Sequence, residues 1–169
     1  MKFKIIKFKN INSTNTKAIE LIKKGKTLPT ILTAEKQTKG RGRYGRKWKS
    51  QKGNLFMSIY HQLYSNISVK KITDKNCLKI KKALSSFLTH KIKIKAPNDL
   101  LINGKKFCGI LQEIIIYKNI KYLIVGIGIN LFKSPKINNY PTTHISKYSN
   151  KRINKSLIYN AIKRSYENK

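Results

Sequence analysis

The stretch FCGILQEIIIYKNIKYLIVGIGINL, residues 107–131, contains two long runs that are rich in β-branched and aromatic residues. This composition favours β-strands. The runs are joined at Lys118-Asn119, where polar residues indicate a turn. Upstream, Asn103 is followed by Gly104, and an Asn-Gly pair is typical of a tight hairpin turn. The stretch therefore predicts neighbouring antiparallel strands and a sheet as the framework of the fold.

The other regular segments complete an α+β domain. Apolar residues at helical spacing predict a helix over residues 14–24, with Ser13 as its N-cap and Gly25 just beyond its end. The same spacing predicts helices over residues 68–89 and after Ser156, which we expect to cap the last helix. Further strands are expected at residues 2–9, 30–35, 54–61 and 91–95. We expect one domain over residues 1–169, with a mixed, mainly antiparallel sheet and about three helices packed on it.

The charge of the chain is extreme but weakly informative. Its 169 residues include 38 Lys and Arg and 6 Asp and Glu, which gives a formal net charge of +32. Only five of the basic residues are arginine, and the lysines are spread along the whole chain. This pattern favours an AT-rich genome with lysine at surface positions over a dedicated polyanion partner, because nucleic-acid-binding domains usually cluster their basic residues. Three of the five arginines lie within residues 41–46.

The cysteines and the N-terminus indicate a cytoplasmic protein. Cys77 and Cys108 are far apart and form no C-x-x-C pair, so neither a disulfide framework nor a zinc cluster is expected. The start, MKFKIIKFKN, alternates charged and apolar residues, unlike a signal peptide, and no segment approaches the length of a membrane span. We therefore expect no membrane association.

The loop over residues 36–53 is long, and its segment GRGRYGRKW (40–48) spells G-x-G-x-x-G. A dinucleotide-binding loop must be followed by a helix and, about 20 residues later, by an acidic residue. Here the next expected element is a strand, and residues 62–68 contain no acid. A P-loop is also excluded, since no G-K-[ST] follows. Two interpretations of this loop remain. It is either a flexible surface loop whose arginines have no function, or an arginine-glycine loop that closes over a phosphate-bearing ligand.

Several motifs, taken in order, resemble those of biotin protein ligases. GRGRYGRKW resembles that family's glycine-arginine loop, and Ser13-Thr14-Asn15 resembles its STN element. KAPNDLLINGKKFCGILQE (95–113) resembles its KWPND segment and the strand that follows a lysine, and VGIGIN (125–130) resembles its G-x-G-I-N strand end. The resemblance covers roughly residues 11–131 and implies the catalytic-domain fold of biotin and lipoate ligases.

The family's chemistry requires two steps. Biotin and ATP with Mg²⁺ first give biotinyl-5′-AMP and pyrophosphate, and a lysine of a biotin carboxyl carrier protein then attacks the adenylate. Carboxylate attack on a phosphate needs fixed positive charge rather than a protein nucleophile. The resemblance implies no firm metal site, because Mg²⁺ enters with the ATP phosphates. Because the chain begins almost at the matched motifs and ends at residue 169, we expect neither an N-terminal winged helix nor a C-terminal β-barrel domain in it. The resemblance also implies a possible homodimer through a sheet edge.

The site residues implied by the resemblance fall into three sets. Lys106, Arg43 and Asp99 are the catalytic candidates. Biotin contacts are implied for Ser13, Thr14, Asn15, Gln37, Arg41, Gly42, Arg43, Lys106 and Gly109. ATP or adenylate contacts are implied for Gly40, Arg41, Arg43, Gly45, Trp48, Asn98, Asp99 and Asn130.

Two positions depart from the family pattern, and two other functions remain open. Ala96 replaces the family's aromatic residue before Pro-Asn-Asp, and Cys108 replaces its usual alanine. A lipoate or octanoate ligase or transferase is an alternative within the same superfamily. A basic nucleic-acid-binding module is an alternative from another class, although we expect no specific nucleic-acid partner.

Overall fold

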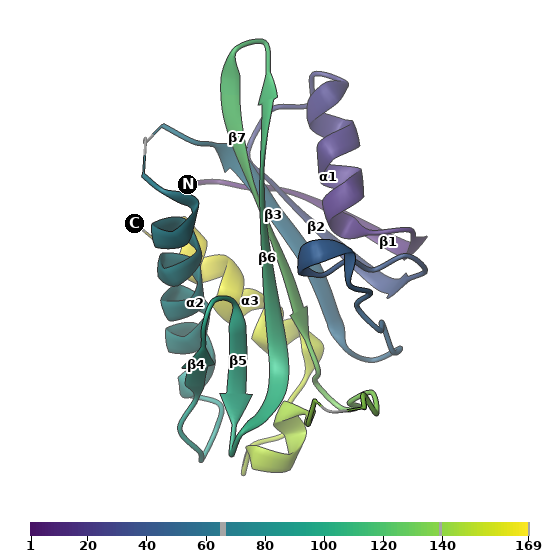
Figure 1. The fold of residues 1–169 in the computed structure, drawn as a ribbon, viewed down its shortest axis with the longest axis vertical. Helices are drawn as coiled ribbons and strands as arrows, with labels where there is room; N and C mark the ends of the chain where they lie inside the picture. The colour runs from purple at the N-terminus through teal and green to yellow at the C-terminus, as the bar shows by residue number, and fades with distance from the viewer. Residues whose placement is uncertain (65–66, 139, 169) are drawn as a thin grey trace.

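A seven-stranded sheet forms the framework, as the sequence predicts (Figure 1). The computed structural model describes residues 1–64, 67–138 and 140–168. The strand order is β1-β2-β3-β7-β6-β5-β4. β1 and β2 pair in parallel and all other neighbours pair antiparallel, so the predicted fold class is confirmed. The strands are β1 (Lys4–Ile11), β2 (Thr30–Gln37), β3 (Leu55–Gln62), β4 (Lys93–Lys95), β5 (Asp99–Ile102), β6 (Lys105–Tyr117) and β7 (Ile120–Ile129).

Two tight turns fix the register of the central strands. Asn103 and Gly104 connect β5 to β6 with φ values of 49° and 73°. Lys118 and Asn119 connect β6 to β7 with φ values of 48° and 60°. Two successive positive φ values match the right-handed twist of a two-residue hairpin. Both predicted turns are confirmed, and the second one places Gly109 of β6 opposite Gly128 of β7.

The three helices are α1 (Thr14–Lys23), α2 (Val69–Ser85) and α3 (Lys155–Glu167). The N-cap prediction for Ser13 is confirmed, since its hydroxyl accepts the backbone N–H of Thr16. The prediction that Ser156 caps the last helix is wrong. Asn154 is the N-cap, because its backbone is extended and its side chain accepts the N–H of Leu157 at 2.8 Å. Ser156 therefore lies inside the first turn of α3.

The helices cover the two faces of the sheet unequally. On one face α2 and α3 pack on a large core, to which Ile59, Ile80 and Ile162 belong. On the other face α1 packs through Ala18 and Ile22 in a smaller cluster. Figure 1 shows α1 in front of the upper part of the sheet and α3 behind it. Below α1 on the same face, the loop that contains the short 3-10 helix η1 (Arg43–Gly45) crosses the sheet.

The segment after β7, expected to be irregular, is held by specific hydrogen bonds. Its regular structure is one short 3-10 helix, η2 (Ile145–Tyr148). The fully buried Asn54 holds the turn that leaves β7, because its Oδ1 accepts the backbone N–H groups of Leu131, Phe132 and Lys133. Further on, Thr142 pairs with Lys106 in an isolated parallel bridge beside β6. Among the described residues, no helix combines the length and apolar character needed to cross a membrane.

Replacing Asn54 by alanine should destabilise the fold, because three backbone donors lose their acceptor and the Lys133 carbonyl loses a donor. We expect a loss of about 3 kcal/mol in the free energy of unfolding, measured by urea denaturation. Asn54→Asp keeps the acceptor oxygen and should lose less. An Asn54→Ala protein with wild-type stability would contradict this account.

Candidate active site

The floor of the candidate site is a row of residues that run across four strands on the α1 face. Phe56 of β3 pairs with Gly128 of β7, which pairs with Gly109 of β6, which pairs with Asp99 of β5. Directly paired residues point to the same face of a sheet. The two glycines therefore leave a patch of backbone without side chains of its own between Phe56 and Asp99. In the next row on the same face, Gly126 again lacks a side chain.

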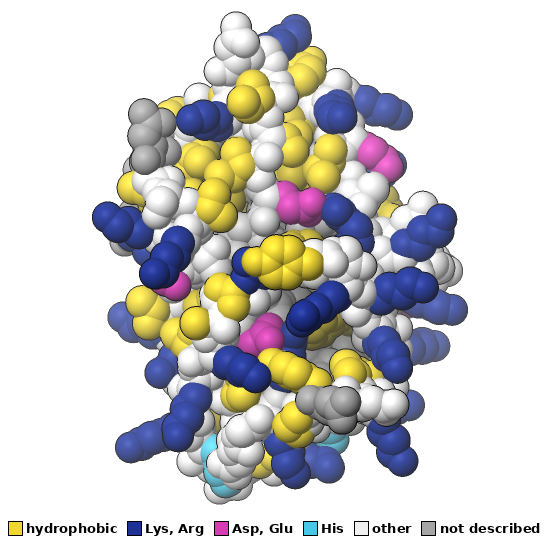
Figure 2. Space-filling model, viewed as in Figure 1, with side chains coloured by type: hydrophobic (Ala, Val, Ile, Leu, Met, Phe, Trp, Pro, Cys, Tyr) yellow, Lys and Arg dark blue, Asp and Glu magenta, His cyan; other side chains and the backbone are white. Residues whose placement is uncertain are grey.

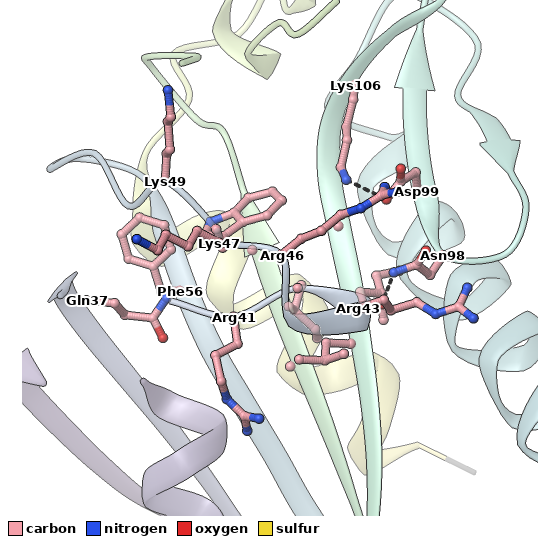
Figure 3. Close-up of a pocket in the computed structure, with 18 of the residues that line it drawn as sticks. Gln37, Arg41, Arg43, Arg46, Lys47, Lys49, Phe56, Asn98, Asp99 and Lys106 are labelled. Atoms are coloured by element: carbon pink, nitrogen blue, oxygen red, sulfur yellow. Dashed lines mark hydrogen bonds and ion pairs between the residues drawn. The ribbon is translucent and has the colours of Figure 1, made fainter. Parts of the chain in front are cut away.

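A cavity of about 540 Å³ lies above this floor (Figure 3). Its walls come from the N-terminus of α1, the 40–49 loop, the strands of the floor and the segment after β7. Most residues that the sequence assigned to the site line this cavity: Ser13, Thr14, Asn15, Gln37, Arg41, Gly42, Arg43, Trp48, Asn98, Asp99, Lys106, Gly109 and Asn130. Gly40 and Gly45 do not line it. Gly40 instead lies tightly against Trp48 and Gln37, where a Cβ would be 2.7 Å from the Trp48 carbonyl oxygen.

The indole of Trp48 lies directly on the two paired glycines. A Cβ on Gly128 would be 2.6 Å from Cε2 of Trp48, and a Cβ on Gly109 would be 2.7 Å from its Cζ3. Real contacts are not that short, so an alanine at either position would displace the ring. The glycines are thus needed for close approach rather than for backbone flexibility.

Lys106 is confined by three groups inside the cavity. Its ammonium forms an ion pair with Oδ1 of Asp99 at 2.7 Å. It also lies 5.4 Å from the ring centroids of both Trp48 and Tyr140, within the range of a cation–π interaction. The other Asp99 oxygen, Oδ2, accepts the hydroxyl of Tyr140 at 2.6 Å. Burial, and then the hydrogen bond to Asp99, raise the pKa of Tyr140 well above its usual value, so it remains a donor.

The three arginines of the loop point in different directions (Figure 3). Arg46 extends toward Asp99 and Lys106, whereas Arg41 and Arg43 point away from that pair. The guanidinium of Arg43 donates to the hydroxyl of Tyr44 at 2.7 Å and lies over its ring. The site residues implied by the resemblance include Arg41 and Arg43 but not Arg46, which also lines the cavity.

A polar network forms the end of the cavity near α1. Gln37 accepts the backbone N–H of Thr14 at 2.8 Å and the Thr14 hydroxyl at 3.1 Å. The buried Ser58 donates to Thr14 and Asn15, as two alternative directions for one hydroxyl proton. Together these side chains present hydroxyl and amide groups at a helix N-terminus, where backbone N–H groups are also available.

Glu113 ties this network to the loop. Its carboxylate accepts Nδ2 of Asn15 at 2.7 Å and Nη2 of Arg41 at 2.8 and 2.9 Å. Glu113 ends the segment KAPNDLLINGKKFCGILQE (95–113), but the resemblance implied no role for it. The signal that could have found it is its place on the α1 face of β6, four residues after Gly109 and therefore on the same side of the strand.

Asn98 and Asn130 hold backbone around the cavity. The Asn98 amide donates at 2.7 Å to the carbonyl of Ile110, which follows Gly109 on β6. The Asn130 amide donates to the Thr143 carbonyl at 3.0 Å, and its Oδ1 is buried without a partner among the described residues. Both side chains therefore stabilise the walls, and Asn130 also offers one free acceptor.

The described residues offer neither an activated nucleophile nor a metal cluster at the cavity. Burial raises the pKa of both cysteines, that of Cys77 to about 11, so both remain thiols. None of the three histidines lines the cavity within the part of the chain that the structure describes. Across residues 1–64, 67–138 and 140–168, no three His, Cys, Asp or Glu side chains lie together as a metal site would require.

The basic side chains do not gather into a nucleic-acid-binding stripe on the face that carries the loop. Figure 2 shows lysines and arginines distributed around that whole face. This distribution agrees with the interpretation that most lysines occupy ordinary surface positions.

Comparison with known proteins identifies the family of this chain. The profile of the biotin/lipoate A/B protein ligase family matches residues 7–130. The chain belongs to this family. It is 33% identical over 168 residues to the bifunctional ligase/repressor BirA of Bacillus subtilis, an alignment that covers 93% of this chain and 50% of that protein. The chain thus spans about half the length of this curated relative.

Solved structures of biotin protein ligases share the fold. The Aquifex aeolicus enzyme in complex with biotin and ATP superposes with a TM-score of 0.81 at 32% identity, over 99% of this chain and 70% of that one. The Leishmania major enzyme in complex with biotinyl-5-AMP also has a TM-score of 0.81, at 24% identity, over 99% of this chain and 75% of that one. The predicted biotin/lipoate ligase catalytic-domain fold is confirmed.

The contact between Trp48 and the glycines gives a direct prediction. Gly128→Ala should displace the indole and shift its fluorescence emission to longer wavelength, because the ring becomes more exposed to water. Trp48 is the single tryptophan of the chain, so emission reports on it alone. Gly42→Ala is the matched control, since a Cβ there is no closer than 3.4 Å to any atom. An unchanged emission spectrum for Gly128→Ala would show that the indole does not lie on this floor.

Proposed function

We propose that this chain is an ATP-dependent biotin–protein ligase that forms biotinyl-5′-AMP and transfers biotin to a lysine of a biotin carboxyl carrier protein. The observation that carries the proposal is the confined ammonium of Lys106, next to a glycine floor on which Trp48 lies, in a cavity whose other end is polar. The identity to the Bacillus subtilis ligase/repressor and to the Aquifex aeolicus ligase supports the same assignment.

The biotin head group binds at the α1 end of the cavity in this proposal. Thr14, Asn15 and Gln37 present hydroxyl and amide groups there, and the buried Ser58 holds the first two from behind. A ureido ring has one carbonyl acceptor and two N–H donors, which such groups can satisfy. Gly109 and Gly128 let the indole of Trp48 lie close against the floor, and Gly126 does the same for Asn15. The fused ring and the aliphatic chain then lie in the cavity beside these side chains. The carboxylate at the end of biotin's aliphatic chain then lies near Lys106.

Adenylation joins the biotin carboxylate to the α-phosphate of ATP. A carboxylate oxygen attacks the α-phosphorus, and the bond to the β-phosphate oxygen breaks to release pyrophosphate. Two anions approach each other in this step, so a fixed cation between them lowers the barrier. Lys106 supplies that charge, and Arg46 adds a second one from the loop. Arg43 contributes only after its guanidinium leaves Tyr44 and turns inward over the adenylate.

Mg²⁺ fits this site only as a companion of ATP. Both oxygens of Asp99 are already engaged, by Lys106 and by Tyr140. Bound to the phosphates, the ion would neutralise charge on the leaving pyrophosphate. On the cavity wall, the Oδ1 of Asn130, which has no partner among the described residues, is an oxygen that would be open to the ion.

Transfer needs an accepting amine at the open side of the cavity. The amine of a carrier lysine attacks the adenylate carbonyl, AMP leaves with the C–O bond electrons, and the lysine nitrogen loses its proton. The family's own partner, a biotin carboxyl carrier protein, is the acceptor that this chemistry requires. A homodimer through a sheet edge stays a prediction, for which β1 is a candidate as the terminal strand of the sheet.

Lys106→Ala should reduce biotin-dependent ATP–pyrophosphate exchange by roughly a hundredfold or more, because the charge between the reacting anions is lost. The matched control is Lys105→Ala, which removes an exposed neighbour on the same strand and should leave exchange unchanged. If the wild-type protein forms no biotinyl-adenylate with biotin, ATP and Mg²⁺, the proposed function is wrong.

Competition distinguishes biotin from lipoate. With an apo carrier domain present, biotin should be attached to a single carrier lysine, and a hundredfold excess of lipoate should not reduce the yield. The reason is that a lipoate ring has no N–H or carbonyl group for the polar α1 end of the cavity. Preferential attachment of lipoate, detected by mass spectrometry of the carrier, would assign the chain to the other branch of the family.

A further inference from the structure

The segment after β7 touches the proposed catalytic lysine in two ways, although it lies beyond the residues matched by the family profile. The first contact is through backbone. The N–H of Lys106 donates to the carbonyl of Pro141 at 2.9 Å, and the carbonyl of Lys106 accepts the N–H of Thr143 at 2.8 Å. These two bonds form the isolated parallel bridge between Lys106 and Thr142. The backbone of Lys106 is therefore held on both edges of its strand, by β5 on one side and by residues 141–143 on the other.

The second contact is through side chains. Tyr140 donates to Oδ2 of Asp99 at 2.6 Å, while Oδ1 of the same carboxylate holds the Lys106 ammonium at 2.7 Å. A carboxylate fixed by two donors, one on each oxygen, cannot rotate without breaking a charge-assisted hydrogen bond. The Asp99 and Lys106 side chains are only 15% and 20% exposed, so water replaces such a bond poorly.

We propose that residues 140–143 position Lys106 for adenylation, with the Tyr140 hydroxyl fixing the Asp99 carboxylate that aims the ammonium. This inference rests on the proposed ligase function. Tyr140 acts through Asp99 and is thus a positioning residue. Without its hydroxyl, Asp99 can turn toward other cations of the cavity, and the lysine spends less time between the reacting anions.

The surroundings of Tyr140 explain why a hydroxyl is needed at this point. Lys95 lies 4.7 Å and Lys106 lies 5.4 Å from the centroid of its ring. Arg46 is a third cation close enough to act electrostatically on Tyr140. One carboxylate thus faces several cations and could pair with any of them. The neutral donor of Tyr140 favours the single orientation in which Asp99 contacts Lys106.

The segment is itself anchored to the sheet, so it can act as a fixed support. The Asn130 amide, at the end of β7, donates to the carbonyl of Thr143, and the Asn130 carbonyl accepts the N–H of Ile145. Asn54 holds the turn at the start of the same segment. Residues 140–143 therefore connect the end of β7 with the lysine on β6.

Tyr140→Phe tests the inference, because it removes the hydroxyl and keeps the ring that contacts Lys95 and Lys106. We expect kcat for biotin-dependent ATP–pyrophosphate exchange to fall about tenfold, the usual scale of one hydrogen bond to a charged group, with the Kd for biotin unchanged. Tyr166→Phe is the matched control. The Tyr166 hydroxyl donates to Oδ1 of Asn76 at 2.7 Å, and neither residue lines the cavity. Exchange at the wild-type rate in Tyr140→Phe would overturn the inference.

A double-mutant cycle tests whether Tyr140 works through Asp99. In the Asp99→Asn background, Tyr140→Phe should have little further effect, because the carboxylate it orients is already gone. Full additivity of the two effects would show that Tyr140 acts independently and would overturn the positioning role.

A third readout does not depend on catalysis. Trace acetylation with acetic anhydride, read by mass spectrometry, should label Lys106 faster in Tyr140→Phe than in the wild type, while labelling of Lys105 stays constant. Equal labelling of Lys106 in both proteins would overturn the inference even if the wild type proved inactive as a ligase. An inactive wild type with faster labelling in the variant would reject only the proposed function.

Discussion

The register of the β6–β7 hairpin is the constraint on which the site depends. The two-residue turn at Lys118-Asn119 places Gly109 directly opposite Gly128. Because side chains alternate along a strand, a shift by one residue would replace these glycines with Ile110 and Ile127 on the cavity face. Both isoleucines are buried in the main core on the opposite face, so such a shift would also expose core residues. Core packing and an open cavity floor therefore require the same register.

Confinement, rather than charge alone, distinguishes Lys106 in a chain with 38 basic residues. Most lysines are solvated and free to move, so their charge is screened and poorly directed. Lys106 instead lies between two aromatic rings and a carboxylate that is itself held by Tyr140. The chain has only six acidic residues, and one of them, Asp99, forms the ion pair with Lys106. In the proposed adenylation step, an incoming carboxylate and phosphate take over the Lys106 contact that Asp99 maintains.

Local rules predicted the sheet, both hairpin turns and the Ser13 cap, because each is decided by residues close in sequence. The cap of α3 was missed because Asn154 and Ser156 are both good N-cap residues, and only backbone conformation selects between them. The roles of Tyr140 and Glu113 were missed for a different reason. Their partners Asp99 and Arg41 are 41 and 72 residues away. Alternation along β6 gives the face on which Glu113 lies, but no local pattern says which distant residue meets either side chain. The direction of Arg46 likewise depends on how the whole loop folds onto the glycine floor.

The central claim is that the cavity over the glycine floor accepts biotin with its carboxylate near Lys106. Isothermal titration calorimetry of the wild-type protein with biotin, with and without ATP and Mg²⁺, tests it most directly. The account predicts saturable binding of one biotin per chain, and a larger heat with ATP and Mg²⁺ present because adenylation follows binding. No binding heat in either condition, from protein that circular dichroism shows to be folded, would contradict it.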